Sequence, residues 1–556
     1  MHRPARSCLF RSRSLSGLLA AASLFGAGLV QAAERQVLAV AAVDGYADLK
    51  KQLGWFGRQI DNPGLAAMVE SLIMLSTQGR GLTGLDVKRP AGIVVTSDGT
   101  DLAAHGLVPV TDLDKLLTSL QGIIGPATTD GAVRRVTLPS GIKLSITDRD
   151  GWAVIAPSAL EATDAAPLLA ALATTYTVGI EAFPSRMSDA VRKQLEAALD
   201  QAAAASAAQG QPMDPGALKA ALGGLRQTEA LSLGFGIDDT AGQVFVENRA
   251  VSLPGSVSAA AFEVAGRGTL TAGMPPLAAG ERHALRGYIA QAIPDEARAQ
   301  FLEALDQTLP READDPLTRT VSRLVYDLLS ATLAAGGIDA ALAVDTSQAA
   351  RDKPLPEVTA SVRVKDGAAL EQRVKQAFSA GGNAALPGVR PRFDVGKAGA
   401  ATLHTISVDV FDDELASRIG KSLDLTLAVA PNYAVVLAGG NAAARAEAAL
   451  AASGRPIADA TPIAALEANA ASVFDYVGTL GREGQAAKAG ATAREAGGGA
   501  VALRVTPIER GLATRLSIDS GALKAGAAMA APERPVGPGG IPLPDVPPGF
   551  PIPLPR

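Results

Sequence analysis

The chain has 556 residues, of which 47% are hydrophobic and 19% charged, so it is long enough for several cores and too apolar to be intrinsically disordered. Its 51 Lys and Arg and 56 Asp and Glu give a formal charge of −5, which argues against a basic footprint for nucleic acid or anionic lipid. Aromatic residues make up only 4%, so the cores are expected to be packed from small aliphatic side chains.

Residues 1–33 have the pattern of a secretory signal peptide. Four arginines and no acid come first, the apolar run GLLAAASLFGAGLV follows at 17–30, and Ala32 or Ala33 offers a small residue for cleavage. Cys8, the one cysteine, lies ahead of the apolar run and leaves with this segment. We therefore expect an exported protein, in the periplasm or at the cell surface, whose mature chain has no cysteine and a formal charge of −9.

Residues 34–270 are expected to form the first of two α+β halves. The signals for its strands, turns and helices follow in chain order at 37–53, 91–120, 143–162, 185–209 and 230–256. Residues 37–53 place a strand, Asp44 and a helix in sequence, which suggests a degenerate extra copy of the strand-to-helix unit described below.

Residues 271–337 are expected to form a helical connector. The stretch 281–309 predicts two helices broken before Pro294, and 314–337 predicts one helix with an apolar stripe at helical spacing that packs on a sheet. The stripe comprises Leu317, Val321, Leu324, Leu328 and Leu329.

Residues 338–530 are expected to form the second half. Its units follow at 338–378, 424–450 and 500–525. The fold class that we predict is α+β, internally duplicated, with mostly antiparallel sheets built from β-hairpin and helix units.

The two halves share the phrase V-x-V-x-D-x-x-x-L. Alternate valines suit one face of a strand, the aspartate suits the cap of the following helix, and the leucine is the first core residue of that helix. The matched residues are Val108, Val110, Asp112 and Leu116 in the first half and Val362, Val364, Asp366 and Leu370 in the second. We therefore interpret Asp112 and Asp366 as helix caps and not as catalytic acids.

A second shared feature is an aromatic residue directly after a hairpin turn. Trp152 follows Asp150-Gly151 in DGWAVIAPSALE, and Tyr433 follows Pro431-Asn432 in PNYAVVLAGGNAAA. We expect the two aromatic side chains to occupy equivalent places and to cover a small-residue core; stacking on a ligand is the alternative.

Residues 531–556 are rich in proline, which rules out a continuing helix or sheet, so a disordered tail is expected. Its apolar residues make the tail a candidate for docking on a protein partner. They are Ile541, Leu543, Phe550, Ile552 and Leu554.

The sequence shows no catalytic or metal-binding motif, and we predict no catalytic, cofactor-binding or metal-binding residue. Gly420-Lys421-Ser422 lacks the opening glycine of a phosphate-binding loop, and Ser140 and Lys143 lie in β surroundings where a penicillin-recognising motif would open a helix. The mature histidines, His105, His283 and His404, have no second ligand close by in sequence, and acidic clusters at 238–239, 314–315 and 412–414 fall at turns or helix starts.

The phrases LVPVTDLDKLL and DGWAVIA resemble those of a family of uncharacterised exported bacterial proteins. The resemblance covers residues 85–260 and implies secretion and an α+β repeat fold, with no assigned activity. The second half departs from it through Tyr433 and the Pro431-Asn432 turn.

Three functions fit these observations. The first is an exported, non-enzymatic binding or structural protein. The second is a carrier of a small apolar or lipid ligand between sheet and helices, because cores of small residues can leave a cavity. The third is a hydrolase whose carboxylates come from distant segments. No nucleic-acid partner, no cofactor and no integral membrane segment after signal removal are expected, because no later run of about 18 uncharged apolar residues occurs.

Overall fold

The computed structural model describes residues 35–531 with internal gaps, so the expected signal peptide and Pro-rich tail lie outside the described residues. The gaps are 158–164, 209–224, 266–282, 309–315, 350–354, 380–387, 411–412, 414–415, 417–419, 453–461 and 481–482.

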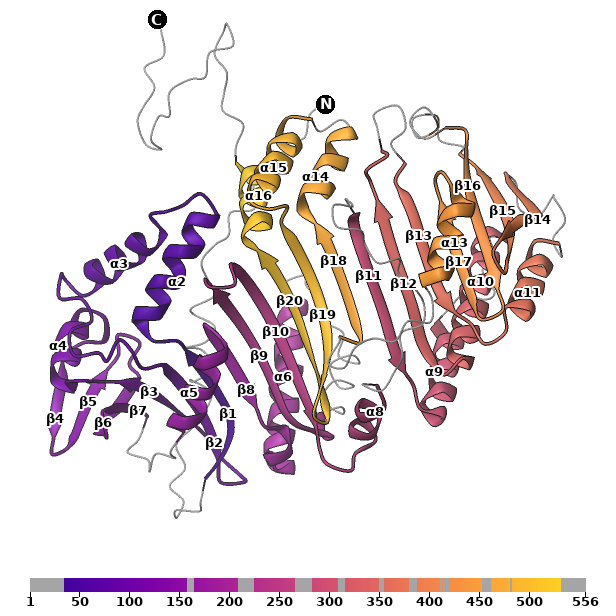
Figure 1. The fold of residues 1–556 in the computed structure, drawn as a ribbon. Coiled ribbons are helices and arrows are strands. Elements are labelled where there is room, and N and C mark those ends of the chain that lie inside the picture. The colour runs from indigo at the N-terminus through magenta and orange to yellow at the C-terminus, as the bar shows by residue number, and fades with distance from the viewer. Residues whose placement is uncertain are drawn as a thin grey trace, which may run out of the picture.

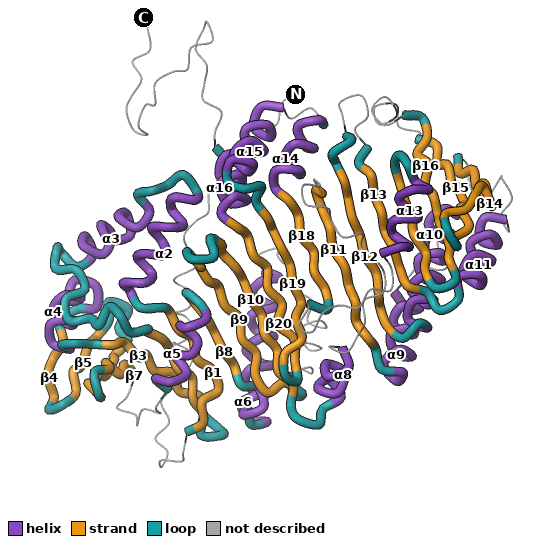
Figure 2. Tube along the Cα trace, in the orientation of Figure 1, coloured by secondary structure: helices purple, strands orange, loops and turns teal. Residues whose placement is uncertain are grey.

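All strands belong to one antiparallel sheet (Figures 1 and 2). The strands of the first half are β1 (Gln36–Val43), β2 (Ala91–Ser97), β3 (Leu102–Pro109), β4 (Ala127–Asp130), β5 (Val133–Thr137), β6 (Lys143–Arg149), β7 (Trp152–Ala156), β8 (Val178–Ala182), β9 (Thr228–Asp238) and β10 (Gln243–Ser252). Those of the second half are β11 (His283–Ala292), β12 (Gly337–Asp345), β13 (Glu357–Arg363), β14 (Val389–Ala398), β15 (Ala401–Asp409), β16 (Ser422–Ala430), β17 (Tyr433–Ala438), β18 (Ala464–Asn469), β19 (Ala500–Ile508) and β20 (Gly511–Asp519).

Helices connect the strands. In the first half they are α2 (Tyr46–Gln59), α3 (Leu65–Ser76), α4 (Leu113–Ile124), α5 (Ala166–Thr175), the short 3-10 helix η2 (Pro184–Arg186), α6 (Asp189–Ala208) and α8 (Val257–Ala265). In the second half they are α9 (Asp295–Thr308), α10 (Pro316–Ala334), α11 (Gly367–Ser379), α13 (Ala442–Ala452), α14 (Ala470–Thr479), α15 (Glu483–Glu495) and α16 (Ser520–Ala530). None of the described helices is long and apolar enough to span a bilayer. The predicted α+β antiparallel fold is confirmed.

The order of strands in the sheet is the same in the two halves. From one edge to the centre it is β4-β5-β6-β7-β3-β2-β1-β8-β9-β10, and from the other edge it is β14-β15-β16-β17-β13-β12-β11-β18-β19-β20. The halves meet where β10 pairs with β20, antiparallel. Because these two strands are equivalent, a pseudo-twofold axis perpendicular to the sheet relates the halves, and each face of the sheet maps onto itself.

The structure corrects the predicted helical connector at 271–337. Residues 283–292 form strand β11, which pairs with β12 on one side and β18 on the other and is the counterpart of β1. The Ala-rich segment has helix-forming residues, but pairing on both sides decides its conformation, which no local propensity reveals. The later part of the stretch is helical as predicted, in α9 and α10.

The strand-to-helix phrase has the same geometry in both halves. Asp112 accepts a hydrogen bond from the backbone N–H of Lys115 at 3.0 Å, and Asp366 accepts one from that of Ala369 at 3.0 Å. Asp44 does not repeat this arrangement, because its carboxylate accepts hydrogen bonds from Gly45 N–H and Gln52 Nε2 ahead of and within α2. The expected order of strand, Asp44 and helix at 37–53 is present in β1 and α2, but Asp44 does not cap the helix as Asp112 and Asp366 do. The two caps are confirmed.

Loss of either cap is expected to cost about 1 kcal/mol of unfolding free energy, because one N–H of the first helical turn then loses its partner. Asp112→Ala and Asp366→Ala should give similar losses in urea denaturation of residues 34–556. Asp112→Asn, which retains a capping oxygen, serves as the control. Equal stability of Asp112→Ala and the unsubstituted chain would contradict the assignment.

Trp152 and Tyr433 occupy equivalent places, as predicted. Each begins the strand after its turn, and the residue before each accepts a 2.9 Å hydrogen bond through its carbonyl, from Val110 N–H in one half and Val364 N–H in the other. The rings pack against separate cores, Trp152 beside α5 and Tyr433 beside α13. They do not meet in one cleft.

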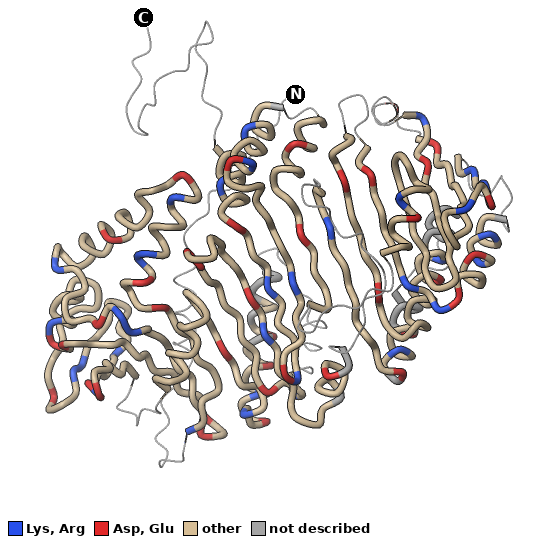
Figure 3. The backbone as a smooth tube through the Cα atoms, viewed as in Figure 1, with Lys and Arg blue, Asp and Glu red and all other residues tan. Residues whose placement is uncertain are grey.

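The two faces of the sheet are covered differently, and we name them by residues near the axis. The open face carries Leu233, Leu466 and Leu503, and the closed face carries Phe245 and Glu247. Helices α4, α10 and α11 pack on the open face, and α5 and α13 pack on the closed face. Helices α14, α15 and α16 pack together at one end of the central strands. Most residues of the central strands are uncharged (Figure 3).

Candidate functional site

A cavity of about 470 Å³ lies between α10 and the open face of the second half. Leu328 and Leu329 of α10 line one side of it. Strands β11, β12, β13, β17, β18 and β19 form the other side, with Ile289, Ala340, Leu342, Leu466 and Leu503 among the lining residues. No charged residue lines this α10 pocket among the residues that the structure describes.

Small residues at alternate positions of the strands create the space. Gly287, Ala340, Ala360 and Ala464 all face α10, because residues two apart in a strand share a face. At Gly287 even a methyl group would lie 2.7 Å from Cδ1 of Leu466, so the backbone and that leucine are already in close contact. The leucines of α10 hold the helix away from strands that carry glycine and alanine at these positions, and the space between them is the pocket.

Thr332 is one of three lining residues with a hydroxyl group, the others being Tyr288 and Ser361. The side chain of Thr332 is buried, with 1% exposure, and its Oγ1 has no hydrogen-bond partner among the described residues. A buried hydroxyl without a partner costs about 1–3 kcal/mol. A polar atom of a ligand, or a water molecule, at this point would remove that cost.

The α10 pocket opens onto exposed apolar side chains of the central strands. Leu466 and Leu503 at its edge are 41% and 37% exposed, and the cross-strand row continues through Leu516 and Val246 at 40% and 45%. Contiguous apolar exposure of this kind is uncommon on a monomer and marks binding surfaces. The row crosses the boundary between the halves at the pairing of Leu516 with Val246, next to the pseudo-twofold axis.

A second candidate is a charged cluster at α11, β14 and β15. Lys375 Nζ lies 2.7 Å from Oε1 of Glu371 and 2.9 Å from Oδ1 of Asp394, and Nε2 of His404 lies 3.5 Å from Oε1 of Glu371. These two carboxylates and one imidazole lie close enough together to suggest a metal site.

The chemistry of this cluster does not suit a metal ion. Nδ1 of His404 accepts a 3.1 Å hydrogen bond from the backbone N–H of Asp394, so the neutral ring carries its proton on Nε2 and neither nitrogen has a free lone pair. The ammonium of Lys375 already lies between the carboxylates, and Glu371 raises the pKa of Lys375. We interpret the cluster as an ion-pair network around a buried histidine.

The buried strand histidines give the protein a dependence on pH. Burial lowers the pKa of His404 and of His105 below the ordinary value, so the folded chain binds fewer protons than the unfolded chain below about pH 6.5. Their contribution to stability is complete above that pH and declines as the pH falls. We expect the unfolding free energy to drop between pH 7.5 and 5.5, and less steeply in His404→Gln. An equally steep drop in the variant would contradict this assignment for His404.

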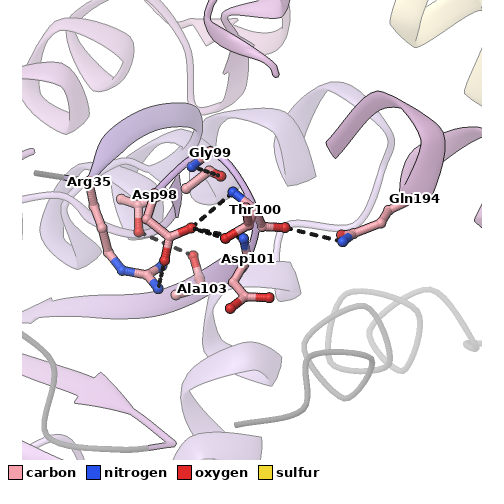
Figure 4. Close-up of polar contacts among 9 residues, drawn as sticks. Arg35, Asp98, Gly99, Thr100, Asp101, Ala103 and Gln194 are labelled. Carbon is pink, nitrogen blue, oxygen red and sulfur yellow. Dashed lines mark hydrogen bonds and ion pairs between the residues drawn. The ribbon is translucent and has the colours of Figure 1, made fainter. Parts of the chain in front are cut away.

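Among the described carboxylates, that of Asp98, in the turn between β2 and β3, has a strongly lowered pKa (Figure 4). Its carboxylate accepts hydrogen bonds from the backbone N–H groups of Asp101 and Thr100, at 2.9 and 3.0 Å, and from Arg35 at 3.0 Å. These donors, the backbone groups first, lower the pKa of Asp98 to about 2. The hydrogen bonds from Thr100 and Asp101 close the turn, and Arg35 ties the turn to the start of β1. We therefore interpret Asp98 as a structural residue.

A wider hollow of about 710 Å³ beside α11 has a polar rim and bears on the hydrolase hypothesis. Its carboxylates are those of Asp366 and Glu371. Asp366 caps α11, and Glu371 pairs with Lys375. Both acids therefore have structural partners, which makes this hollow a weaker candidate than the α10 pocket despite its larger volume.

Sequence reasoning anticipated a cavity in a small-residue core but assigned no residue to it, although Leu328 and Leu329 of the predicted stripe line the α10 pocket. The predicted stripe of α10 does pack on the sheet through Leu324 and Leu328. The Ser140-to-Lys143 segment forms a turn that leads into β6, as expected. Of the acidic clusters, 238–239 lies at the β9–β10 turn, whereas 314–315 and most of 412–414 lie outside the described residues.

Comparison with known proteins gives no relative. No family model, curated protein or solved structure matches the chain.

Proposed function

We propose that this is an exported, non-enzymatic binding protein that holds an apolar ligand of the acyl-chain class in the α10 pocket. The observation that carries the proposal is an uncharged cavity of about 470 Å³, a volume within the range of about 300–1,000 Å³ common for small-molecule sites. Export rests on the N-terminal sequence pattern.

The ligand class follows from the lining. Aliphatic side chains from α10 and six strands offer dispersion contacts and no ionic anchor, so a flexible hydrocarbon chain fits better than a charged metabolite. Each buried methylene contributes about 0.8 kcal/mol, so a chain of about ten would gain roughly 8 kcal/mol before the costs of association. Thr332 supplies one hydroxyl for a polar atom of the ligand.

The exposed row beside the pocket supports a role in carrying the ligand. Leu466 and Leu503 line the pocket and also face solvent, so a chain can leave the pocket along an apolar surface without crossing a polar rim. A non-enzymatic role is consistent with the structural partners found for Asp366 and Glu371.

Filling the pocket tests the proposal. Ala340→Phe places a ring in the cavity, and we expect it to weaken binding of the fluorescent fatty acid cis-parinaric acid by at least tenfold at the second-half site. The measurement is a fluorescence titration of the mature chain after removal of co-purifying lipid. Ala464→Phe should act in the same way from another strand.

Ala343→Phe is the matched control, because residue 343 lies on β12 but on the other face of the sheet. Circular dichroism checks that each variant is folded. Saturable binding that is unchanged in both filled variants, or no binding by the unsubstituted chain, would refute the proposed site.

A further inference from the structure

The first half has the same apolar floor as the α10 pocket. Val108 and Val362 are equivalent residues of the two halves. Counting along the strand pairings from them makes Ile93 the counterpart of Leu342, Ile180 that of Leu466 and Leu233 that of Leu503. All of these residues are aliphatic and all lie on the open face. The pocket floor is therefore built twice in the sheet.

The floor of the first half is exposed in the part of the chain that the structure describes. Ile93, Ile180 and Leu233 are 38%, 43% and 51% exposed. The neighbouring row on the same face, Val43, Val178 and Phe235, is 37%, 42% and 37% exposed. Two adjacent rows of large apolar side chains at this exposure form a contiguous patch, which is the signature of a binding surface.

Helix α3 has the place in the chain that α10 has in the second half. The orders β1-α2-α3-β2 and β11-α9-α10-β12 correspond, and α10 covers its floor. In contrast, no residue of α3 is buried, and Figure 1 shows α3 beside α2 and α4, away from β9. Met68, Leu72 and Leu75 are 52%, 55% and 77% exposed and form one stripe, being four and three residues apart.

The connection from α3 to β2 contains two glycines in the left-handed conformation, next to Arg80, which donates a hydrogen bond to the carbonyl of Thr118 at 2.8 Å. Gly79 and Gly81 have positive φ values of 83° and 64°, and a methyl group added to Gly79 would meet no atom within 4 Å. Residues of this kind absorb the backbone changes of a hinge.

We propose that Ile93, Ile180 and Leu233 form the floor of a second site for an acyl chain, and that α3 covers this site when it is occupied. Covering buries the α3 stripe and the exposed floor together, which gives both surfaces the apolar contact that each lacks. The inference rests on the proposed function, since the ligand class is that of the α10 pocket. It predicts two bound chains for each protein chain.

Binding stoichiometry tests the second site. The mature chain should bind two equivalents of cis-parinaric acid, Leu233→Asp one, Ala340→Phe one, and the double variant none. Residue 233 is half exposed, so the carboxylate does not enter a core; Ile180→Asn is a second variant with the same expected result. One equivalent that Ala340→Phe alone removes would overturn the second site and leave the proposed function standing. No binding at all would overturn both.

The movement of α3 has its own test. The mature chain has no cysteine, so spin labels can be placed at Leu72→Cys and Asn248→Cys, the latter exposed on the open face next to Leu233. The distance between the labels should shorten when cis-parinaric acid is added, and should not change in the Leu233→Asp background. An unchanged distance with two equivalents bound would overturn the role of α3 as the cover. If the distance between the labels is already short before the fatty acid is added, α3 closes on the empty floor, and the role of α3 as a cover for the occupied site would also be overturned.

Discussion

Replacing Arg515 by leucine is expected to lower the free energy of unfolding by about 2–3 kcal/mol. Arg515 Nε lies 2.6 Å from Oε2 of Glu247, whose side chain is only 8% exposed, and Tyr176 donates a 2.9 Å hydrogen bond to Oε1 of the same carboxylate. Without this guanidinium, the buried carboxylate keeps the hydroxyl of Tyr176 and the more distant guanidinium of Arg249, whose Nε lies 3.8 Å from Oε1. Burial, followed by the bond to Glu247, raises the pKa of Tyr176 to about 12, so the phenol stays protonated.

The position of this pair makes the effect global. Glu247 of β10 and Arg515 of β20 face each other across the pairing that joins the halves, on the pseudo-twofold axis. Urea denaturation should show one transition at lower midpoint. The double variant Glu247→Leu/Arg515→Leu should be more stable than Arg515→Leu alone, because no unpaired charge remains.

Arg504→Leu is the control for Arg515→Leu. Arg504 lies beside Arg515 on the neighbouring strand and is exposed. Its loss should therefore change the free energy of unfolding by no more than about 0.5 kcal/mol. A midpoint for Arg515→Leu that matches this control would show that the pair does not hold the halves together.

Gly234→Val is expected to destabilise the chain by about 1–3 kcal/mol, because the added side chain meets the Tyr176 ring. The ring of Tyr176 lies over Gly234 and Gly179, which pair with each other, and a methyl group at 234 would lie 2.2 Å from two of its ring carbons. The two glycines, which have no side chain, therefore leave the space that the ring of Tyr176 occupies when its hydroxyl reaches Glu247.

A second substitution separates this explanation from a general intolerance of valine. Tyr176→Ala is destabilising alone, but adding Gly234→Val to it should cost less than Gly234→Val costs in the unsubstituted chain. Gly526→Ala is the control for glycine replacement, since it lies exposed in α16 with no atom within 4 Å of an added methyl group, and should be neutral or slightly stabilising. Equal costs of Gly234→Val in both backgrounds would contradict the slot.

Local signals in the sequence predicted the repeated units well. The phrase around Asp112 and Asp366 predicted strand, cap and helix, because each of these depends on residues within one turn of the next. The matching of Trp152 with Tyr433 followed from the same short-range pattern. Strand β11 was missed because its neighbours, β12 and β18, lie about 50 and 180 residues away along the chain.

The candidate sites depend on contacts that no local pattern contains. The α10 pocket joins Gly287 and Ala340 to Leu503, and the separation of these positions depends on strand order. The network of His404 is likewise visible only after β14 and β15 are paired next to α11. The contrast between α3 and α10 appears only when the two halves are compared in space.

Native mass spectrometry of residues 34–556, produced in a bacterial host and purified without detergent, tests the central claim most directly. We expect a fraction of the protein to carry extra mass that organic extraction removes and that matches fatty-acyl lipids, and less of it in Ala340→Phe than in Ala343→Phe. A homogeneous ligand-free mass that stays unchanged after incubation with fatty acid would contradict the claim that the α10 pocket is a binding site.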